Sequence, residues 1–181
     1  DTRWYQLLFD WLQQLWTVER AWRKWLEKGL YYMKDYEKKV MRFVFTNRMK
    51  SDMLFYGLIN GVEFFGNSYF FGRISDNFFD KKKFKEVALQ KIVKDFMINP
   101  DDERLIKPDF YITKGDNKLE LANFKISYDS DHAPIAEVSC NYNYYKLFEK
   151  DCFYIYDTKN ILCLYDERKA LIGVIAKVVN Y

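Results

Sequence analysis

The strongest pattern in the chain is a stripe of hydrophobic residues along its first thirty positions. Tryptophans and aliphatic residues recur there at alternating steps of four and three, which places them on one face of an α-helix. Most of the intervening positions are charged or carry amides, and Gly29 suits a helix end. The pattern predicts an amphipathic helix over residues 3–28, whose stripe consists of Trp4, Leu8, Trp11, Leu15, Val18, Trp22 and Trp25.

The composition changes after this segment. All 5 tryptophans lie before residue 26, whereas Tyr, Phe, Asn and Lys are frequent after residue 32. A chain of 181 residues is long enough for one domain preceded by a docked or protruding helix. Two interpretations stay open: residues 1–32 form a separable or fused segment in front of a single domain over 33–181, or one natural chain has an uneven composition.

Hydrophobic runs with strand-like alternation or many β-branched residues predict a largely antiparallel sheet in the rest of the chain. Asn60-Gly61 lies between two such runs and predicts a tight hairpin, because both turn positions need positive φ. Bulges or close backbone approaches are expected at Gly57, Gly66 and Gly72. The expected strands cover residues 40–46, 54–59, 62–66, 69–74, 110–113, 119–128, 135–140, 152–156, 161–165 and 171–179.

One main helix is expected within this part, over residues 84–97, where hydrophobic residues share one face and Asn99-Pro100 ends the pattern. A short helix is expected near residues 142–148. The fold class is therefore α+β, a mainly antiparallel sheet with one main helix, preceded by the long N-terminal helix. The short helix carries a tyrosine cluster that allows either core packing or stacking on bases, made of Tyr142, Tyr144 and Tyr145.

Charge and cysteine content narrow the setting only slightly. The net charge of +3 permits a nucleic-acid or membrane partner without requiring one. The 3 cysteines lack C-x-x-C spacing and the chain has 1 histidine, which disfavours a disulfide framework or a structural zinc site and favours a reducing compartment. No signal peptide or bilayer-spanning run is recognisable, so a cytoplasmic protein without a transmembrane segment is expected. The Lys-, Asn- and Tyr-rich composition suits a phage or mobile-element gene.

One arrangement of polar residues points to chemistry. Asp109 opens an expected strand, and Asn123 and Lys125 share a face of the next strand, because strand side chains alternate. This order resembles a degenerate motif of the PD-(D/E)xK nuclease superfamily over residues 80–165. The resemblance implies a Mg²⁺ or Mn²⁺ site formed by Glu86, Asp109 and Asn123, with Lys125 as the catalytic lysine. Asn123 stands where the family has Asp or Glu, so the site has less negative charge.

Two classes of function follow from these patterns. The leading hypothesis is a non-enzymatic protein-binding module, such as a phage or mobile-element inhibitor, that uses the N-terminal stripe and a sheet face and needs no cofactor. The stripe then contacts a partner protein or a second copy, since tryptophan is typical of binding hot spots. Packing of the stripe on the chain's own sheet is the structural alternative, and its mixed charges disfavour a membrane surface.

The alternative function is a PD-(D/E)xK-like domain that binds nucleic acid or cuts it with a metal. A basic cluster before the expected helix would then contact phosphate groups; otherwise it is a solvated helix start. The cluster consists of Lys81, Lys82 and Lys83.

Overall fold

The computed structural model describes residues 33–47, 54–74, 81, 84–93, 105–115, 118–126 and 136–178. The chain divides into two compact units, Asp1–Met33 and Lys34–Tyr181, and the described helices and strands belong to the second unit. The helix predicted over residues 3–28, with its tryptophan stripe, therefore lies outside the described residues. The boundary predicted at residue 32 stays a prediction.

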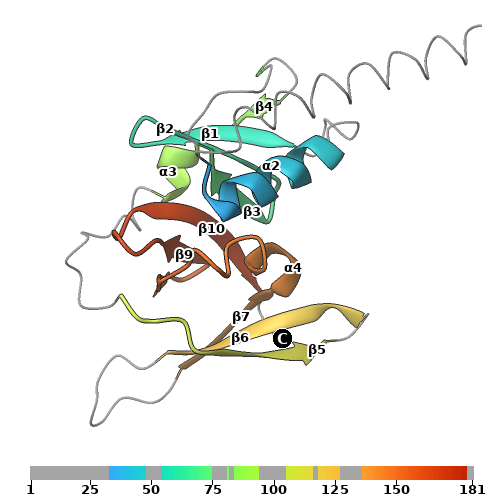
Figure 1. Cartoon of the computed structure of the whole chain (residues 1–181), viewed down its shortest axis with the longest axis vertical. Coiled ribbons are helices and arrows are strands. Elements are labelled where there is room, and N and C mark those ends of the chain that lie inside the picture. Colours follow the sequence, from blue (N-terminus) through green and yellow to red (C-terminus); the bar gives the residue numbers. More distant parts are fainter. Residues whose placement is uncertain are drawn as a thin grey trace, which may run out of the picture. The chain divides into compact units, whose positions relative to one another are not determined.

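The second unit is a mixed α+β fold dominated by a ten-stranded sheet (Figure 1). The sheet order is β4-β1-β2-β3-β10-β7-β6-β5, and the β8–β9 hairpin joins it through β9 and β10. The elements are α2 (Asp35–Asn47), β1 (Phe55–Ile59), β2 (Val62–Gly66), β3 (Phe70–Arg73), β4 (Lys85–Glu86), α3 (Leu89–Val93), β5 (Phe110–Lys114), β6 (Glu120–Ile126), β7 (Ala136–Asn141), α4 (Tyr142–Tyr145), β8 (Tyr154–Asp157), β9 (Ile161–Tyr165) and β10 (Leu171–Val178).

Every strand pair in the described part is antiparallel except β1 with β4, so the predicted α+β class with a mainly antiparallel sheet is confirmed. Asn60 and Gly61 have φ values of 51° and 74°, which confirms the predicted β1–β2 turn. Among the described helices, none is long and apolar enough to cross a membrane.

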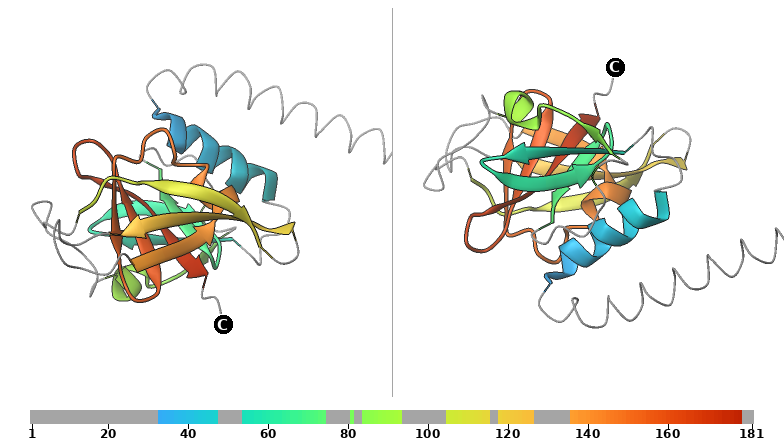
Figure 2. Two further views of the ribbon diagram at one scale, coloured as in Figure 1. Left: turned by 90° about the horizontal axis from the view of Figure 1, so that it is seen from below. Right: turned by 90° about the horizontal axis from the view of Figure 1, so that it is seen from above.

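Strand β10 connects two three-stranded antiparallel groups, which we call the first meander (β1–β3) and the second meander (β5–β7). Gly173–Ile175 pair with β3, whereas Lys177 and Val178 pair with β7. In Figure 1, β10 lies between the two meanders. Figure 2 shows β5, β6 and β7 side by side, with α2 to one side of the strands. The long β-branched run at the C-terminus thus holds the sheet together.

The first meander is buried on both faces. On one face, Gly72 of β3 pairs with Gly173 of β10, and the ring of Phe148 fills the space that two side chains would occupy. A Cβ at Gly72 would lie 2.5 Å from Val40 of α2, which confirms the close approach predicted there. The opposite face packs into a cluster of buried side chains made of Ile59, Phe64, Leu89, Tyr156, Cys163, Tyr165 and Val174.

The strand predicted over residues 40–46 is wrong, because this segment belongs to helix α2. Its buried residues repeat at helical spacing, and the Asp151 carboxylate accepts a hydrogen bond of 2.8 Å from the Tyr36 backbone N–H in the first turn. Glu37 accepts a second bond of 3.1 Å from the Lys34 N–H. Both hydrogen bonds stabilise the start of the helix. The bond to Asp151 could not be predicted from the local sequence pattern, because Asp151 is distant in sequence. The β-branched residues of this segment therefore pack as one helix face.

The main helix predicted over 84–97 is corrected at its start. Lys85 and Glu86 form strand β4. The Lys85 N–H donates to the Leu54 carbonyl at 3.2 Å, and the Val87 N–H donates to the Tyr56 carbonyl at 2.9 Å. Helix α3 begins only at Leu89, whose Cβ lies 2.6 Å from where a Cβ of Gly57 would be. Lys85 and Glu86 pair with the open edge of β1 as a parallel strand, which satisfies their backbone groups. Helix α3 can pack close to β1 because Gly57 has no side chain.

Candidate functional site

The face of the second meander that points away from its buried side is polar. Tyr111 lies opposite Asn123, and Asn123 lies opposite Ser139, so these side chains form one row across three strands. Asp109, Lys125 and Glu137 form a second row. Lys125 lies opposite Glu137 on one side, and on the other side its N–H donates to the Asp109 carbonyl at 3.1 Å. We call this surface the outer face. The register brings Asp109, Asn123 and Lys125 onto one face. Strand alternation predicted this for Asn123 and Lys125, whereas for Asp109 it was implied by the nuclease resemblance.

Asn123 lies at the centre of a hydrogen-bond network on this outer face. Its side chain is only 6% exposed. Its Oδ1 accepts from the Ser139 hydroxyl at 2.7 Å, and its Nδ2 donates to the Thr113 hydroxyl at 2.9 Å and to the Tyr111 carbonyl at 3.3 Å. The amide joins all three strands, which explains why a polar residue is buried here.

The charged row is more open. Asp109, Lys125 and Glu137 are all exposed, and Glu137 accepts a hydrogen bond from the Tyr111 hydroxyl, which raises the pKa of that phenol. Asp109 and Glu137 lie two strands apart, or about 10 Å between backbones. The row therefore places a lysine between two carboxylates without bringing the carboxylates together.

The residues of the outer face do not fit the ligand set that the nuclease resemblance implies. The Asn123 oxygen already accepts a hydrogen bond from Ser139. Of the three metal ligands that the resemblance implies, Asp109 is therefore the one carboxylate that lies on this face. In the part of the chain that the structure describes, no three His, Cys, Asp or Glu side chains form a group suited to a metal ion. The outer face as it stands is better suited to polar contacts than to metal chemistry.

Two further predicted site residues lie elsewhere. Glu86 is on β4, at the opposite end of the sheet order from β5, and its carboxylate accepts from the Tyr56 hydroxyl at 3.0 Å. Lys81 forms an ion pair with Glu63. Lys82 and Lys83 lie outside the described residues. The structure therefore does not bring Glu86 together with Asp109, Asn123 and Lys125, and Lys81 already has an acidic partner.

Strand β5 is the last strand in the sheet order, and its outer edge has no strand partner in the described part of the chain. Hydrogen-bonded pairs alternate along an antiparallel ladder, and residues 109 and 115 direct their backbone groups to β6. The amides of Phe110, Ile112 and Lys114 therefore point to the free edge. An open edge of this kind can accept a further strand.

The other sheet edges differ from β5. Strand β4 is only 2 residues long. Strand β8 is covered at Ile155, which exchanges backbone hydrogen bonds of 2.8 and 3.1 Å with Ile106. Strand β5 has 5 residues, of which Tyr111 is 44% and Ile112 is 48% exposed. The hydrophobic pattern predicted a strand over residues 110–113, but only the sheet order reveals it as an edge.

The three cysteines are buried free thiols. Burial raises the pKa of Cys140, Cys152 and Cys163 to about 12 in each case. A nucleophilic cysteine needs a lowered pKa and access to solvent. These residues are therefore part of the core and do not contribute to the candidate site.

The chain matches no family model, no curated protein and no solved structure.

Proposed function

We propose that this protein is a non-enzymatic module that binds a partner protein by adding an extended strand of that partner to the edge of β5. The single observation that carries the proposal is the five-residue outer edge of β5, which is unpaired among the described strands. Backbone groups supply most of the affinity in strand addition, and side chains on alternate positions supply specificity.

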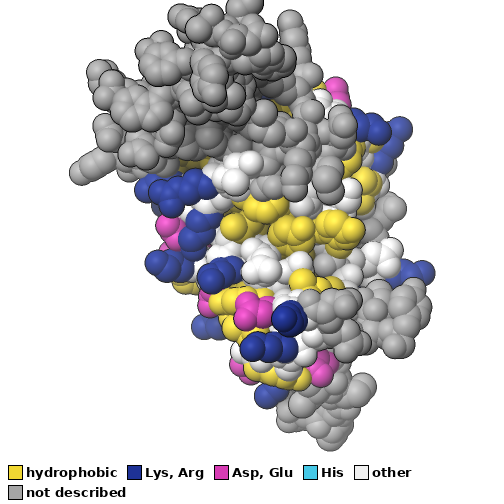
Figure 3. Space-filling view, turned by 90° about the vertical axis from the view of Figure 1, so that its right-hand side faces the viewer, with side chains coloured by type: hydrophobic (Ala, Val, Ile, Leu, Met, Phe, Trp, Pro, Cys, Tyr) yellow, Lys and Arg dark blue, Asp and Glu magenta, His cyan; other side chains and the backbone are white. Residues whose placement is uncertain are grey.

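The side chains around this edge support a protein partner. Tyr111 extends over the outer face and Ile112 over the opposite face, so an added strand gains apolar contacts on both sides. Figure 3 shows a separate band of exposed hydrophobic side chains at mid-height, above the level of β5 in Figure 1, with Lys and Arg side chains along one side of it. Protein interfaces typically combine an apolar centre with a polar rim.

The N-terminal tryptophan stripe remains a second proposed contact. Trp11 and Trp22 belong to that stripe and are the residues expected to contribute most, since tryptophan is enriched at binding hot spots. The stripe and the β5 edge can be tested separately, because the substitutions lie in different parts of the sequence.

A display library of linear peptides without cysteine provides the probe for strand addition. A recovered peptide is titrated into the full chain by fluorescence anisotropy, and amide hydrogen exchange is measured in parallel. Binding should protect the amides of Phe110, Ile112 and Lys114, which point to the free edge. Unchanged exchange at these amides on saturation with peptide would refute strand addition.

The substitution Ile112→Pro removes one edge N–H while leaving the ladder with β6 intact. It should weaken peptide binding at least tenfold, about 1.4 kcal/mol. The matched variant Ile112→Thr keeps the N–H and loses apolar surface, so its effect should be smaller. Equal binding by the wild type and Ile112→Pro would contradict the proposal.

A further inference from the structure

A pocket of about 330 Å³ opens beside β10, where the pairing of this strand passes from β3 to β7. This volume is at the low end of the range for ligand pockets, about 300–1,000 Å³, so the pocket suits a group the size of a single ring. No residue of β5 lines it. The lining consists of Tyr69, Leu119, Asn141, Tyr144, Ala176, Lys177 and Val178.

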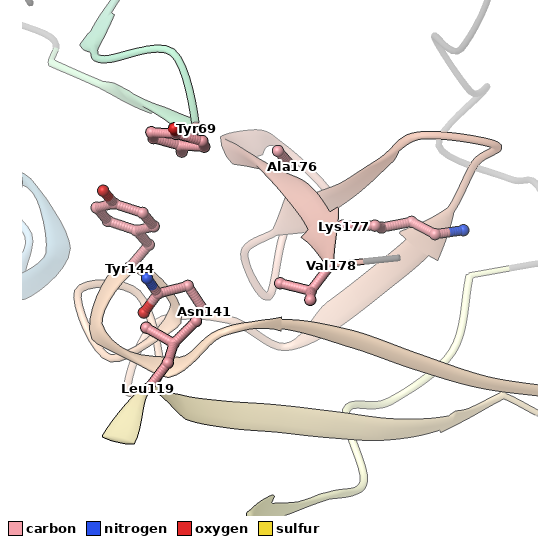
Figure 4. A pocket seen from close by; sticks show the side chains of 7 residues that line it. All are labelled: Tyr69, Leu119, Asn141, Tyr144, Ala176, Lys177 and Val178. Atoms are coloured by element: carbon pink, nitrogen blue, oxygen red, sulfur yellow. The ribbon is translucent and has the colours of Figure 1, made fainter. Parts of the chain in front are cut away.

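Figure 4 shows two tyrosines at one end of the pocket and smaller side chains across from them. The rings of Tyr69 and Tyr144 are nearly parallel, with centroids 6.3 Å apart and an interplanar angle of 13°. Tyr69 is 59% exposed, so much of its ring is open to contact. Val178 and Leu119 face this aromatic end in Figure 4 and provide an aliphatic surface.

One amide holds both tyrosines in place. The Asn67 Oδ1 accepts from the Tyr69 N–H at 2.8 Å, and the Asn67 Nδ2 donates to the Tyr144 hydroxyl at 3.2 Å. Phe70 stacks on Tyr144 with centroids 4.8 Å apart. The Ala176 N–H donates to the Tyr69 carbonyl at 2.7 Å. The Tyr144 ring and the Tyr69 backbone are therefore held before any ligand arrives, which lowers the entropic cost of binding.

The charge of the pocket indicates an uncharged ligand. Lys177 is the one lysine among the lining residues, and Figure 4 shows its side chain pointing away from the pocket. Its Nζ donates to the Asp157 carboxylate at 2.8 Å and to the Thr158 carbonyl at 2.6 Å. This ammonium is engaged elsewhere and does not neutralise a phosphate or carboxylate in the pocket.

Asn141 supplies a directional hydrogen-bond donor. Its Oδ1 accepts from the Asn143 N–H at 2.9 Å and caps helix α4, which fixes which end of the amide carries the oxygen. The Nδ2 group is left as a donor, with no partner within the described residues, and in Figure 4 it lies on the side of Tyr144. A ligand that carries an acceptor can therefore bond to it.

We propose that this pocket binds an uncharged aromatic ring with a hydrogen-bond acceptor, in the form of a tyrosine side chain of a partner protein. The ring stacks on Tyr69, and its phenol oxygen accepts from the Asn141 amide. A protein ligand fits better than a nucleic acid because no free lysine among the lining residues is available for a phosphate. The assignment to a partner protein rests on the proposed function, whereas ring binding does not.

N-acetyl-tyrosinamide titrated into the full chain, with binding followed by NMR chemical shifts, tests the pocket without involving β5. Tyr69→Ala should weaken binding about tenfold through loss of stacking, whereas Tyr69→Phe, which keeps the ring, should bind like the wild type. Asn141→Ser keeps the helix cap and removes the amide donor, so binding should weaken about fivefold. Absence of binding to the wild type, or equal binding by these variants, would overturn the proposal.

Three further probes distinguish the sources of the ring. N-acetyl-phenylalaninamide lacks the acceptor and should bind more weakly than the tyrosine probe, with no further loss in Asn141→Ser. Adenosine or a single-stranded oligonucleotide should bind more weakly than the tyrosine probe, and tighter binding of either would overturn the assignment to a protein ligand. A peptide that loses affinity in Ile112→Pro but not in Tyr69→Ala would show that the β5 edge functions while the pocket does not take part.

Discussion

The first and second meanders have the same local design and opposite surroundings. Each consists of three antiparallel strands, and each is attached to β10. The first is buried on both faces, so that the consecutive residues Phe64 and Phe65 are almost inaccessible. The second has an apolar face, where the ring centroids of Phe124 and Tyr145 lie 4.8 Å apart, and a polar face, where the buried Asn123 network lies beside the exposed charged row.

This difference separates stability from binding. In the first meander, β10, α2 and the short strand β4 cover the edges and faces, so most of its hydrophobic side chains belong to the core, with Leu58 as an exposed exception. In the second meander, β5 keeps a free edge among the described strands, and its exposed residues contribute little to the core. Substitutions in the first meander should therefore change the free energy of unfolding, and those on β5 should change binding.

The largest effect is expected at Gly66 of the first meander. A Cβ at this position would lie 1.8 Å from the Phe70 carbonyl oxygen, a backbone atom that cannot move aside. Gly66→Ala should lower the free energy of unfolding by about 3 kcal/mol or more, measured by urea denaturation. The matched change Gly115→Ala, beside the second meander, places a Cβ 3.3 Å from the flexible Leu121 side chain and should cost far less. Equal losses in the free energy of unfolding for the two variants would contradict the proposed difference between the meanders.

A smaller loss is expected at the Asn123 network. Asn123→Ala removes the partners of Ser139 and Thr113 and leaves the buried Ser139 hydroxyl without its acceptor, at a cost of about 1–3 kcal/mol in the free energy of unfolding. Lys125→Ala, two residues along the same strand, is the control because its side chain is exposed. If both variants unfold at the same urea concentration, the amide does not hold the three strands together.

Acid should weaken the turn between β9 and β10, which is tied to the start of α2. Burial alone would raise the pKa of Asp166, but the ion pair with Lys34 and the N–H groups of Ala170 (2.8 Å) and Arg168 (3.0 Å) outweigh it and lower that pKa. The stabilisation is therefore fully present above the ordinary carboxyl pKa of about 3.9 and is lost as the pH falls below it.

The variant Asp166→Asn tests this pH dependence. It should cost about 1–2 kcal/mol at pH 7, because an uncharged amide keeps some hydrogen bonds and loses the ion pair. The gap between wild type and variant should stay constant from pH 7 down to about pH 4 and narrow as the pH falls further, measured by urea denaturation at each pH. A gap that also stays constant below about pH 4 would show that the ionised carboxylate does not contribute.

The smallest effect on stability is expected on the charged row of the second meander. Asp109→Ala and Lys125→Ala should change the free energy of unfolding by less than about 0.5 kcal/mol, because both side chains are exposed. We also expect no cleavage of DNA or RNA by the wild type with added Mg²⁺ or Mn²⁺. Metal-dependent cleavage that both substitutions abolish would instead support the nuclease hypothesis and refute the non-enzymatic one.

Much of the strand pattern is readable from the sequence because it depends on neighbouring residues. The Asn60-Gly61 turn and the alternation in β5 and β6 give both strand location and face, which is why Asn123 and Lys125 are correctly placed on one face. Helix α2 and the start of α3 are not readable in this way. Their conformations depend on Asp151 and on the open edge of β1, which are distant in sequence.

The candidate sites show the same division. The sequence predicts that Asn123 and Lys125 share a face, and the nuclease resemblance adds Asp109, but neither predicts that the Asn123 oxygen is already bonded to Ser139. The tyrosine cluster near residue 144 is visible in the sequence, with core packing and base stacking as its alternatives. Its pairing with Tyr69 requires the fold.

The sequence by itself determined the fold class, most strand positions and the polar face of β6, because strand alternation and turn chemistry act over a few residues. Only the tertiary structure decided that β5 is an edge, that Phe148 fills the Gly72 and Gly173 space, and that a pocket opens beside β10. These features depend on which strands become neighbours. Strand order is set by packing between distant segments, and the local pattern of the chain does not specify it.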